Sequence, residues 1–524
     1  MDVEQSVPPR TVRWGRCAVA LLVSLGMVPI VVPSAGAQTP TEDSVPAAER
    51  LREGGDFAGA VALLRTELAL RPENGDAARL LAQTLYWLQD VGEARAAYET
   101  AVARHPQDTT LRLQYARMLA EIGEPARARA LAMPLQDNPA TRAEADALLG
   151  TIAYWEGDLT TARRRFESAL GADPTHAEAR RQLLEILFVT APWVRIASDL
   201  QHDDQPLDRA AAGIEAGWFV TPLMPLRVRV QPRRYRLNDS ASRSLWDAEV
   251  SVAHFAPAAR LDTDLAAGII RRSEIDDDVD WQGRAALGVR LPGHVKIGAR
   301  LERLPYLYTT ASLDASLMVS SGTGFVRWEH PHGWLGEAAY QRQRYPDGNV
   351  VAAAYAWQLV PLVNGATTRF QTGYAFSREH ANDSRFVLAN PTQPYPPGDP
   401  RFDSTGRYAP YYTPSHVITH SVIAAATWRP TRQTTMNLGG TYALRATEDA
   451  PAFVISGGAA VRTLTPRTLS PWEARGSVDV GLRSDLTLTA RGEVRRTPFY
   501  RWSLIGVDLT YRFVRNAISP AFVP

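Results

Sequence analysis

Hydrophobic and polar residues alternate strictly in LTLTARGEVRR, residues 486–496. One register holds Leu486, Leu488, Ala490, Gly492 and Val494, and the other holds Thr487, Thr489, Arg491, Glu493 and Arg495. Because successive side chains of a strand point to opposite faces, this pattern predicts a β-strand with one apolar and one polar face. Similar segments follow one another from 193–201 to 502–513, and together they predict about sixteen strands.

The apolar faces of these strands could cover two different surfaces. In a soluble sandwich they pack against a second sheet, whereas in an outer-membrane barrel they face lipid and the polar faces line a lumen. Barrels of this kind have short turns at one end and longer loops at the other. Here every second connection is short, such as TPLMP, PGH and SD, while the others include HDDQPLDRAA, SEIDDDVD and the stretches 379–415 and 446–470. We therefore expect residues 192–524 to form a transmembrane antiparallel β-barrel of about sixteen strands.

The polar register of the predicted barrel supplies candidate lumen residues. It mixes both signs of charge, which argues against a strongly anion-selective pore. Charges on a barrel wall are more often solvated than part of a binding site, although they still set selectivity. Aromatic residues near strand ends, among them Trp281, Trp334, Trp428, Trp472 and Trp502, fit an interfacial girdle. The candidate contacts to a lumen or polymer are Arg284, Arg290, Lys296, Arg300, Glu302, Arg475, Asp479, Arg491, Glu493 and Arg495.

A different period organises residues 38–191. Ala60, Ala94, Ala128 and Ala162 are spaced 34 residues apart, which is the period of tetratricopeptide repeats. Leu149-Gly150 matches the Leu-Gly of that family's pattern, although Asp146 stands where the family has Trp. We expect four units of two helices each, followed by a capping helix over 177–188. Such arrays bind protein segments along a concave face. The fold class is therefore α + β multidomain, with an N-terminal α-solenoid and a C-terminal barrel.

The first residues have the form of an export signal. Arg10, Arg13 and Arg16 precede an apolar run that ends before Ala35-Gly36-Ala37, a small-x-small cleavage pattern, so residues 1–37 are predicted to be a signal peptide. A retained membrane anchor is the alternative. Cys17 is the only cysteine of the chain and lies inside this segment, which excludes disulfides and Cys-ligated metals from the mature protein. The formal net charge of +1 gives no argument for nucleic-acid binding.

Few residues suggest chemistry. Asp276, Asp277 and Asp278 could hold a cation, but their spacing matches no cation-binding loop and a solvated acidic loop is favoured. The pairs His330 with His332 and His416 with His420 fix no complete metal site. GxSxG, HExxH, phosphate-loop and dinucleotide motifs are absent. We expect no catalytic residue, no cofactor, no metal and no enzymatic activity.

A stretch rich in tyrosine and proline, YPPGDPRFDSTGRYAPYYTPSH, lies in the longest predicted loop. Exposed tyrosine rings stack well on sugars, so Tyr395, Tyr408, Tyr411 and Tyr412 are candidate loop contacts. The alternative is that these rings are buried where the loop folds over the barrel mouth. The sequence does not distinguish the two.

Tetratricopeptide repeats followed by a predicted sixteen-stranded barrel resemble the outer-membrane porins of bacterial exopolysaccharide secretion. These include the C subunit of cellulose synthase, the poly-N-acetylglucosamine porin and the shorter YaiO-like proteins. Tyr411-Tyr412-Thr413-Pro414 resembles the aromatic-x-Ser-Pro stretch of these barrels, with Thr in place of Ser. The resemblance implies a location in the outer membrane, repeats in the periplasm that dock a protein partner, and export of a polysaccharide. The alternative function is a general porin or a surface-binding or scaffold barrel without an export role.

Overall fold

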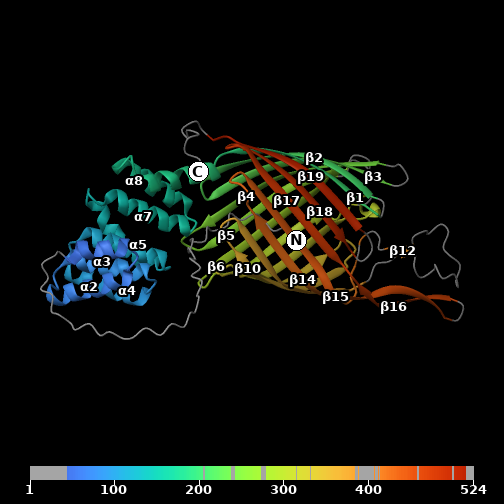
Figure 1. The fold of residues 1–524 in the computed structure, drawn as a ribbon. Coiled ribbons are helices and arrows are strands. Elements are labelled where there is room, and N and C mark those ends of the chain that lie inside the picture. The colour runs from blue at the N-terminus through green and yellow to red at the C-terminus, as the bar shows by residue number, and fades with distance from the viewer. Residues whose placement is uncertain are drawn as a thin grey trace, which may run out of the picture. The chain divides into compact units, whose positions relative to one another are not determined.

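The computed structural model describes residues 44–204, 207–237, 242–272, 279–313, 316–330, 332–383, 387–388, 406–407, 411, 413–456, 459–497 and 501–514. The chain divides into two compact units, with the division between Ile186 and Leu187 (Figure 1). The predicted signal peptide, the acidic residues 276–278 and three of the four loop tyrosines, Tyr395, Tyr408 and Tyr412, lie outside the described residues.

The first unit consists of helix pairs. Each pair corresponds to one repeat: α1 (Ser44–Glu53) and α2 (Phe57–Leu70), α3 (Gly75–Trp87) and α4 (Val91–Arg104), α5 (Thr109–Glu121) and α6 (Pro125–Ala132), and α7 (Arg142–Trp155) and α8 (Leu159–Ala172). The helix α9 (Ala177–Val189) follows as the predicted cap. The four repeat alanines, Ala60, Ala94, Ala128 and Ala162, are fully buried, because a small side chain lets the two helices of a unit approach closely.

The turn inside each unit follows from local chemistry. Gly55, Gly123 and Gly157 have positive φ, a conformation that costs glycine little, and the equivalent turn of the second unit has Gln89 at φ 66°. Asp56, Asp90 and Asp158 cap the helices that follow, each accepting a hydrogen bond from a backbone N–H three residues later.

The third unit is irregular. Its helix α6 ends at Ala132, and residues Met133–Asp137 form the 3₁₀-helix η1. Pro134 has no N–H to continue the α-helical pattern, which explains the early end of this helix. Asp146, the residue at the Trp position of the family pattern, is buried in α7. Its carboxylate accepts hydrogen bonds from Arg165 Nη1 at 3.0 Å and Ser168 Oγ at 2.7 Å.

The second unit is a closed antiparallel barrel. Its strands are β1 (Trp193–Asp203), β2 (Leu207–Thr221), β3 (Met224–Leu237), β4 (Ser242–Ala256), β5 (Leu261–Arg272), β6 (Val279–Leu291), β7 (Val295–Pro305), β8 (Met318–Glu329), β9 (Leu335–Arg344), β10 (Val350–Asn364), β11 (Thr368–Ala381), β14 (Val417–Trp428), β15 (Thr434–Ser456), β17 (Trp472–Arg483), β18 (Leu486–Arg496) and β19 (Arg501–Arg512). Each pairs with its neighbour, and β1 pairs with β19 from Trp193↔Arg512 to Asp203↔Trp502, which closes the barrel. Within the described residues the predicted sixteen-strand barrel is confirmed.

Two connections differ from the sequence prediction. The stretch 446–470, expected to be a loop, is a hairpin in which the far half of β15 pairs with β16 (Ala459–Leu469), while the near half of β15 pairs with β17. HDDQPLDRAA is mostly strand, because β1 extends to Asp203 and β2 begins at Leu207. In both cases the ladder continues through a segment that lacks a sustained alternation of apolar and polar residues. A separate small sheet pairs β12 (Val387–Leu388) with β13 (Gly406–Arg407).

The two ends of the barrel differ. At one end, which we call the short-turn end, strands are joined by turns at 222–223, 257–260, 292–294, 330–334, 365–367, 429–433 and 484–485. At the other, the long-loop end, lie the longer connections 306–317, which contains the helix α10 (Thr310–Leu313), and 382–416. Strand β1 begins at the short-turn end, beside the end of β19.

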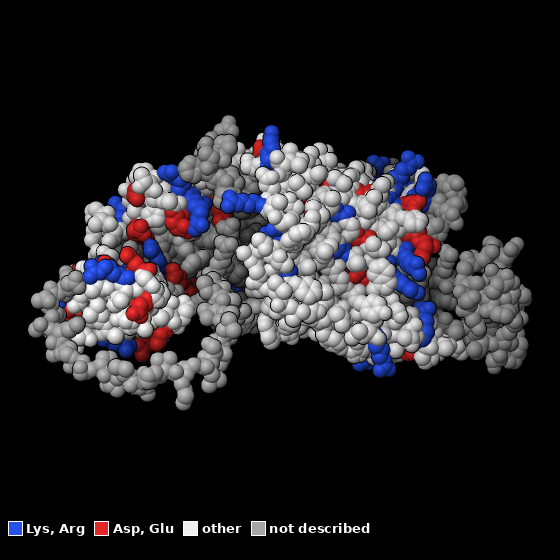
Figure 2. Space-filling model, viewed as in Figure 1, with Lys and Arg blue, Asp and Glu red and all other residues white. Residues whose placement is uncertain are grey.

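The outer wall of the barrel carries exposed apolar side chains. Leu301, Leu438 and Ile505 are each about two-thirds exposed, and most of the wall seen in Figure 2 lacks charge between its ends. Trp281, Trp334 and Trp428 are exposed near strand ends, as predicted. Trp502 instead faces inward, where the Arg495 guanidinium lies 5.2 Å from its ring centroid. None of the described helices is both long and apolar enough to cross a membrane.

Candidate functional site

The inward faces of β5, β6 and β7 carry a group of linked charges. The Arg290 guanidinium binds Asp262 through two bonds, Nε to Oδ2 at 2.9 Å and Nη2 to Oδ1 at 2.7 Å. Lys296 Nζ lies 3.1 Å from the same carboxylate, and Arg284 Nε donates to Asp264 Oδ1 at 3.2 Å. Two acidic side chains thus form ion pairs with three predicted basic lumen residues and offset most of their charge.

A second group spans β17, β18, β19 and β1. Arg495 Nη2 lies 3.1 Å from a carboxylate oxygen of Glu473 and 2.9 Å from one of Glu493. Arg491 Nη2 lies 3.4 Å from both Asp199 and Asp508, so it joins the last strands to the first. These contacts span the junction between β19 and β1 that closes the barrel, and they pair the charged side chains that line it.

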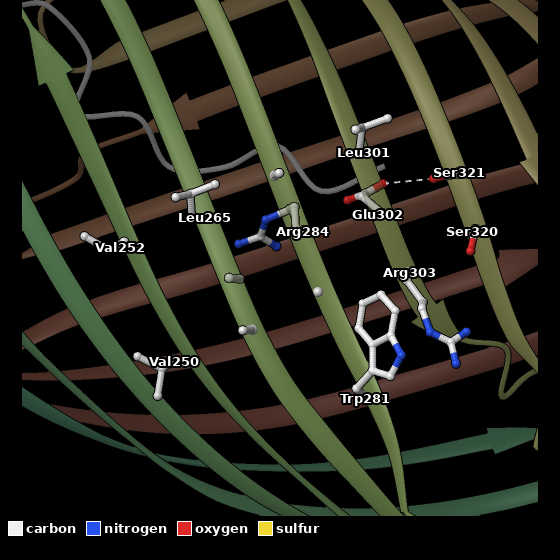
Figure 3. A pocket seen from close by; sticks show the side chains of 14 residues that line it. Val250, Val252, Leu265, Trp281, Arg284, Leu301, Glu302, Arg303, Ser320 and Ser321 are labelled. Atoms are coloured by element: carbon white, nitrogen blue, oxygen red, sulfur yellow. Dashed lines mark hydrogen bonds between the residues drawn. The ribbon is translucent and has the colours of Figure 1, made fainter.

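The remaining candidates have weaker contacts. Arg475 Nη1 is 3.8 Å from Glu473, and Asp479 accepts a hydrogen bond from Thr489 Oγ1 at 2.6 Å. Glu302 accepts one from Ser321 Oγ at 3.5 Å (Figure 3). Arg300 forms no ion pair with any residue that the structure describes. All ten predicted lumen residues thus lie on the inward register, alternating with exposed apolar neighbours such as Leu301 and Val494.

The sequence candidates included one acidic partner, Glu493, but lacked Asp262, Asp264 and Asp199. Asp262 and Asp264 alternate with Leu261, Thr263 and Leu265, and this period-two pattern was the available signal. Asp199 and Asp247 are almost fully buried, each between two arginines. Asp247 contacts Arg233 at 2.5 Å and Arg229 at 3.1 Å. The second arginine on Asp199 comes from the far end of the sequence, so period alone could not identify that pair.

The loop 306–317, in its described residues 306–313 and 316–317, folds inward at the long-loop end. Its residue Leu313 packs against Leu207, Tyr235, Leu245 and Ile270, which face inward from β2 to β5 and are all buried. Reciprocal hydrogen bonds between Thr309 and Ser312, each 3.1 Å from backbone N to side-chain oxygen, fix the turn of α10. The loop therefore narrows the lumen at this end.

Tyr411 packs into the same region. Its ring stacks on that of Tyr345 with centroids 3.8 Å apart, and its hydroxyl donates to Asp347 Oδ2 at 2.7 Å. Tyr411 is almost fully buried, together with Leu317 and Val351. For Tyr411, the structure therefore favours the interpretation in which the ring is buried where the loop folds over the barrel mouth. The buried ring offers no face for stacking on a sugar.

A shallow, mostly apolar depression lies on the wall formed by β4 to β8 (Figure 3). Its volume is about 690 Å³, and Val250, Leu265 and Leu301 are among the side chains that line it. Trp281 and Arg303 border it toward the long-loop end, with the guanidinium 4.6 Å from the Trp ring centroid. Within the described residues no cluster of His, Cys, Asp and Glu could hold a metal ion.

Comparisons with known proteins identify the repeats. A tetratricopeptide repeat family model matches residues 51–109. Intraflagellar transport protein 70B from Homo sapiens is 34% identical over 132 residues, which are 25% of this chain and 20% of that protein. This chain thus spans about a fifth of the length of that curated relative. The prediction that the N-terminal region contains tetratricopeptide repeats is confirmed.

Solved structures match parts of the chain. A chain described as a bacterial polysaccharide outer membrane secretin has a TM-score of 0.43 at 11% identity, and the match covers 62% of this chain and 99% of that one. PilW, described as a type IV pilus biogenesis factor, has a TM-score of 0.26 at 21% identity, covering 27% and 66%. MamA from Desulfovibrio magneticus RS-1 has a TM-score of 0.25 at 16% identity, covering 28% and 84%. These are similarities of partial folds.

Proposed function

We propose that this chain forms an outer-membrane pore that exports a polysaccharide, and that its repeats dock a partner of the secretion or synthesis machinery. One observation carries the proposal: a closed sixteen-strand barrel has an apolar outer wall and a polar inner wall on which most of the candidate charges form ion pairs. A barrel with this number of strands leaves an aqueous channel.

The barrel geometry supports insertion in a membrane. Backbone polar groups can be satisfied within lipid only by helices or closed barrels, and β1–β19 pairing removes the open edges of this sheet. Short turns face the periplasm in barrels of this kind. Since α9 ends at Val189 and β1 begins at the short-turn end with Trp193, this orientation assigns the repeats to the periplasm.

The charge pattern of the lumen favours a neutral or weakly charged polymer. Inward arginines such as Arg290, Arg491 and Arg495 are paired with carboxylates, so they offer little net positive field to attract a polyanion. Hydroxyl groups of a neutral sugar chain can still exchange hydrogen bonds with such a wall at low cost. The proposal assigns transport to this chain and no catalysis.

The repeats offer a surface for a protein partner. Trp87 and Trp155 occupy equivalent positions and are each almost half exposed, whereas the adjacent Tyr86 and Tyr154 donate hydrogen bonds to Glu121 and Glu185. Glu121 lies in α5 and Glu185 in α9, the first helix after each unit, so the tyrosines pack within the array. The exposed tryptophans are suited to an apolar contact with a protein segment.

Deletion of the gene tests the export proposal. We expect polymer to accumulate in the periplasm while its synthesis continues, because the outward path is lost. A general porin would instead show slower uptake of small solutes with secretion unchanged. Polymer secretion at the wild-type level would contradict the proposal.

A further inference from the structure

Arginines gather on the outside of the barrel at its long-loop end. Arg342 and Arg344 lie on the same outward register of their strand as the exposed Tyr340. In the same way Arg378 shares the outward register of Tyr374, and Arg501 shares that of Ile505. Figure 2 shows blue side chains, with some red ones among them, gathered at the right-hand end of the barrel, beyond a mostly white wall. Six exposed outward arginines form what we call the arginine belt: Arg234, Arg342, Arg344, Arg378, Arg496 and Arg501.

The belt differs from the lumen in how its charges are balanced. Inward arginines such as Arg290 and Arg495 bind carboxylates of neighbouring strands. None of the six belt side chains forms an ion pair with a residue in the described part of the chain. The carboxylate of Asp204 lies beside Arg501 and accepts a hydrogen bond from its backbone N–H at 2.8 Å. The six guanidinium groups lie on the lipid-facing register, where an external anion can reach them.

Two belt members lie directly opposite each other. Arg496 of β18 pairs in register with Arg501 of β19, and both side chains point outward. Cβ atoms of directly opposed residues are about 4.5–5.5 Å apart, and like charges at this separation destabilise a sheet. An anion bound between the two guanidinium groups would turn this repulsion into attraction.

A second pair of strands frames a shallow trough. Arg342 on β9 and Arg378 on β11 flank β10, whose outward residues there are Ala352 and Ala354. With neighbouring strands about 4.8 Å apart, the two arginine-bearing strands are separated by about 10 Å. The small alanines leave space between the arginines, and exposed Tyr340 and Tyr374 lie on the apolar side of it.

The neighbourhood identifies the kind of anion. Below the belt the wall is apolar, so a bound molecule must join an anionic group to a hydrocarbon part. Guanidinium groups bind phosphate through paired hydrogen bonds, and anionic lipids attract basic residues at the membrane surface. The strands carry no such basic belt at the short-turn end, where Trp328, Trp428 and Tyr511 occupy outward terminal positions among the described residues.

We propose that the arginine belt binds the phosphate groups of a phosphorylated glycolipid in the outer leaflet, with acyl chains against the apolar wall below. The phosphate between Arg496 and Arg501 offsets their repulsion, and a second lies over Ala352 and Ala354. This inference rests on the proposed membrane location and orientation of the barrel. It does not depend on what passes through the lumen.

Native mass spectrometry of the full-length protein in neutral detergent tests this binding. The probes are bisphosphorylated lipid A, its dephosphorylated form and phosphatidylglycerol. We expect the protein to retain bisphosphorylated lipid A, and the double variants R342Q/R378Q and R496Q/R501Q to bind it roughly 10- to 30-fold more weakly, since each surface arginine contributes about 1 kcal/mol. Equal retention of either other lipid would overturn the proposal.

A matched control and a second readout separate binding from folding. R429Q/R432Q removes two exposed arginines at the short-turn end and should leave lipid binding unchanged. Without lipid, R496Q/R501Q should unfold at an equal or higher temperature than wild type, because a like-charge pair is gone. With lipid A present, it should unfold at a lower temperature than wild type. A variant that is less stable by the same amount in both conditions would show a purely structural role and contradict the proposal.

Discussion

Gly150 lies in α7 under the ring of Phe166 from α8. A Cβ built at Gly150 would lie 2.6 Å from an atom of that fully buried ring. Gly150→Ala should therefore lower the free energy of unfolding by roughly 1–3 kcal/mol, because the ring must shift in a packed core. Gly171→Ala in α8 is the control, since nothing lies within 4 Å of its Cβ and alanine favours a helix. Thermal unfolding that shows the same change for both variants would contradict this packing.

Glu67 makes the stability of the repeats depend on pH. Burial raises the pKa of its carboxyl, but hydrogen bonds from Asn74 at 2.7 Å, from Ser44 and from Arg71 at 2.8 Å outweigh burial and hold the pKa below its ordinary value. A group with a depressed folded-state pKa adds stability above its unfolded pKa of about 4.3, and this stability is lost as the pH falls through the folded pKa.

Replacing this carboxylate should therefore matter most near neutral pH. Glu67→Gln should be clearly less stable than wild type in chemical denaturation at pH 7, and the difference should shrink as the pH is lowered from about 5 to 3. Glu53→Gln, at an exposed site, is the control and should show little difference at any pH. A difference between Glu67→Gln and wild type that stays constant with pH would exclude the ionised carboxylate as its cause.

At the level of elements, strands with a clear period could be predicted and those without one could not. The segment 486–496 alternates without exception and is the strand β18. The far half of β15 and its partner β16 were missed, because this hairpin has no sustained apolar face and contains Pro451 and Pro466. Strand pairing there rests on backbone hydrogen bonds, which leave little mark in the sequence.

The sequence also could not predict that the loop 306–317 folds inward. Leu313 contacts residues from four strands far from it in the chain, and such contacts follow from the closed shape of the barrel. The ion pairs of the lumen show the same limit. The inward register could be read from alternation, whereas the link from Arg491 to Asp199 depends on closure between β19 and β1.

The repeat helices should fold without the barrel. A fragment of residues 44–191 contains the cluster of buried residues from Ala48 to Ile152 and a second one from Ala147 to Ile186. Repeat arrays are stabilised by contacts between neighbouring units, so this fragment should be helical and unfold cooperatively. Circular dichroism with thermal melting measures both. An unfolded fragment would mean that these clusters need the barrel.

For the whole molecule, two periods in the sequence were sufficient to predict the architecture. The 34-residue spacing of buried alanines specifies the repeats, and alternation over about sixteen segments specifies the barrel. The width of the passage depends on the inward loop and on paired charges. The export proposal therefore depends on the lumen, and the ion conductance of the lumen tests it most directly.

Single-channel recording of the full-length protein in a planar bilayer tests that statement. We expect a stable ion current with weak selectivity between cations and anions, because the lumen charges are paired. Replacing 307–316 by a short glycine-serine link should raise the conductance, since Leu313 no longer holds the loop across the lumen. A protein that conducts no current either with the loop or without it would contradict an export pore.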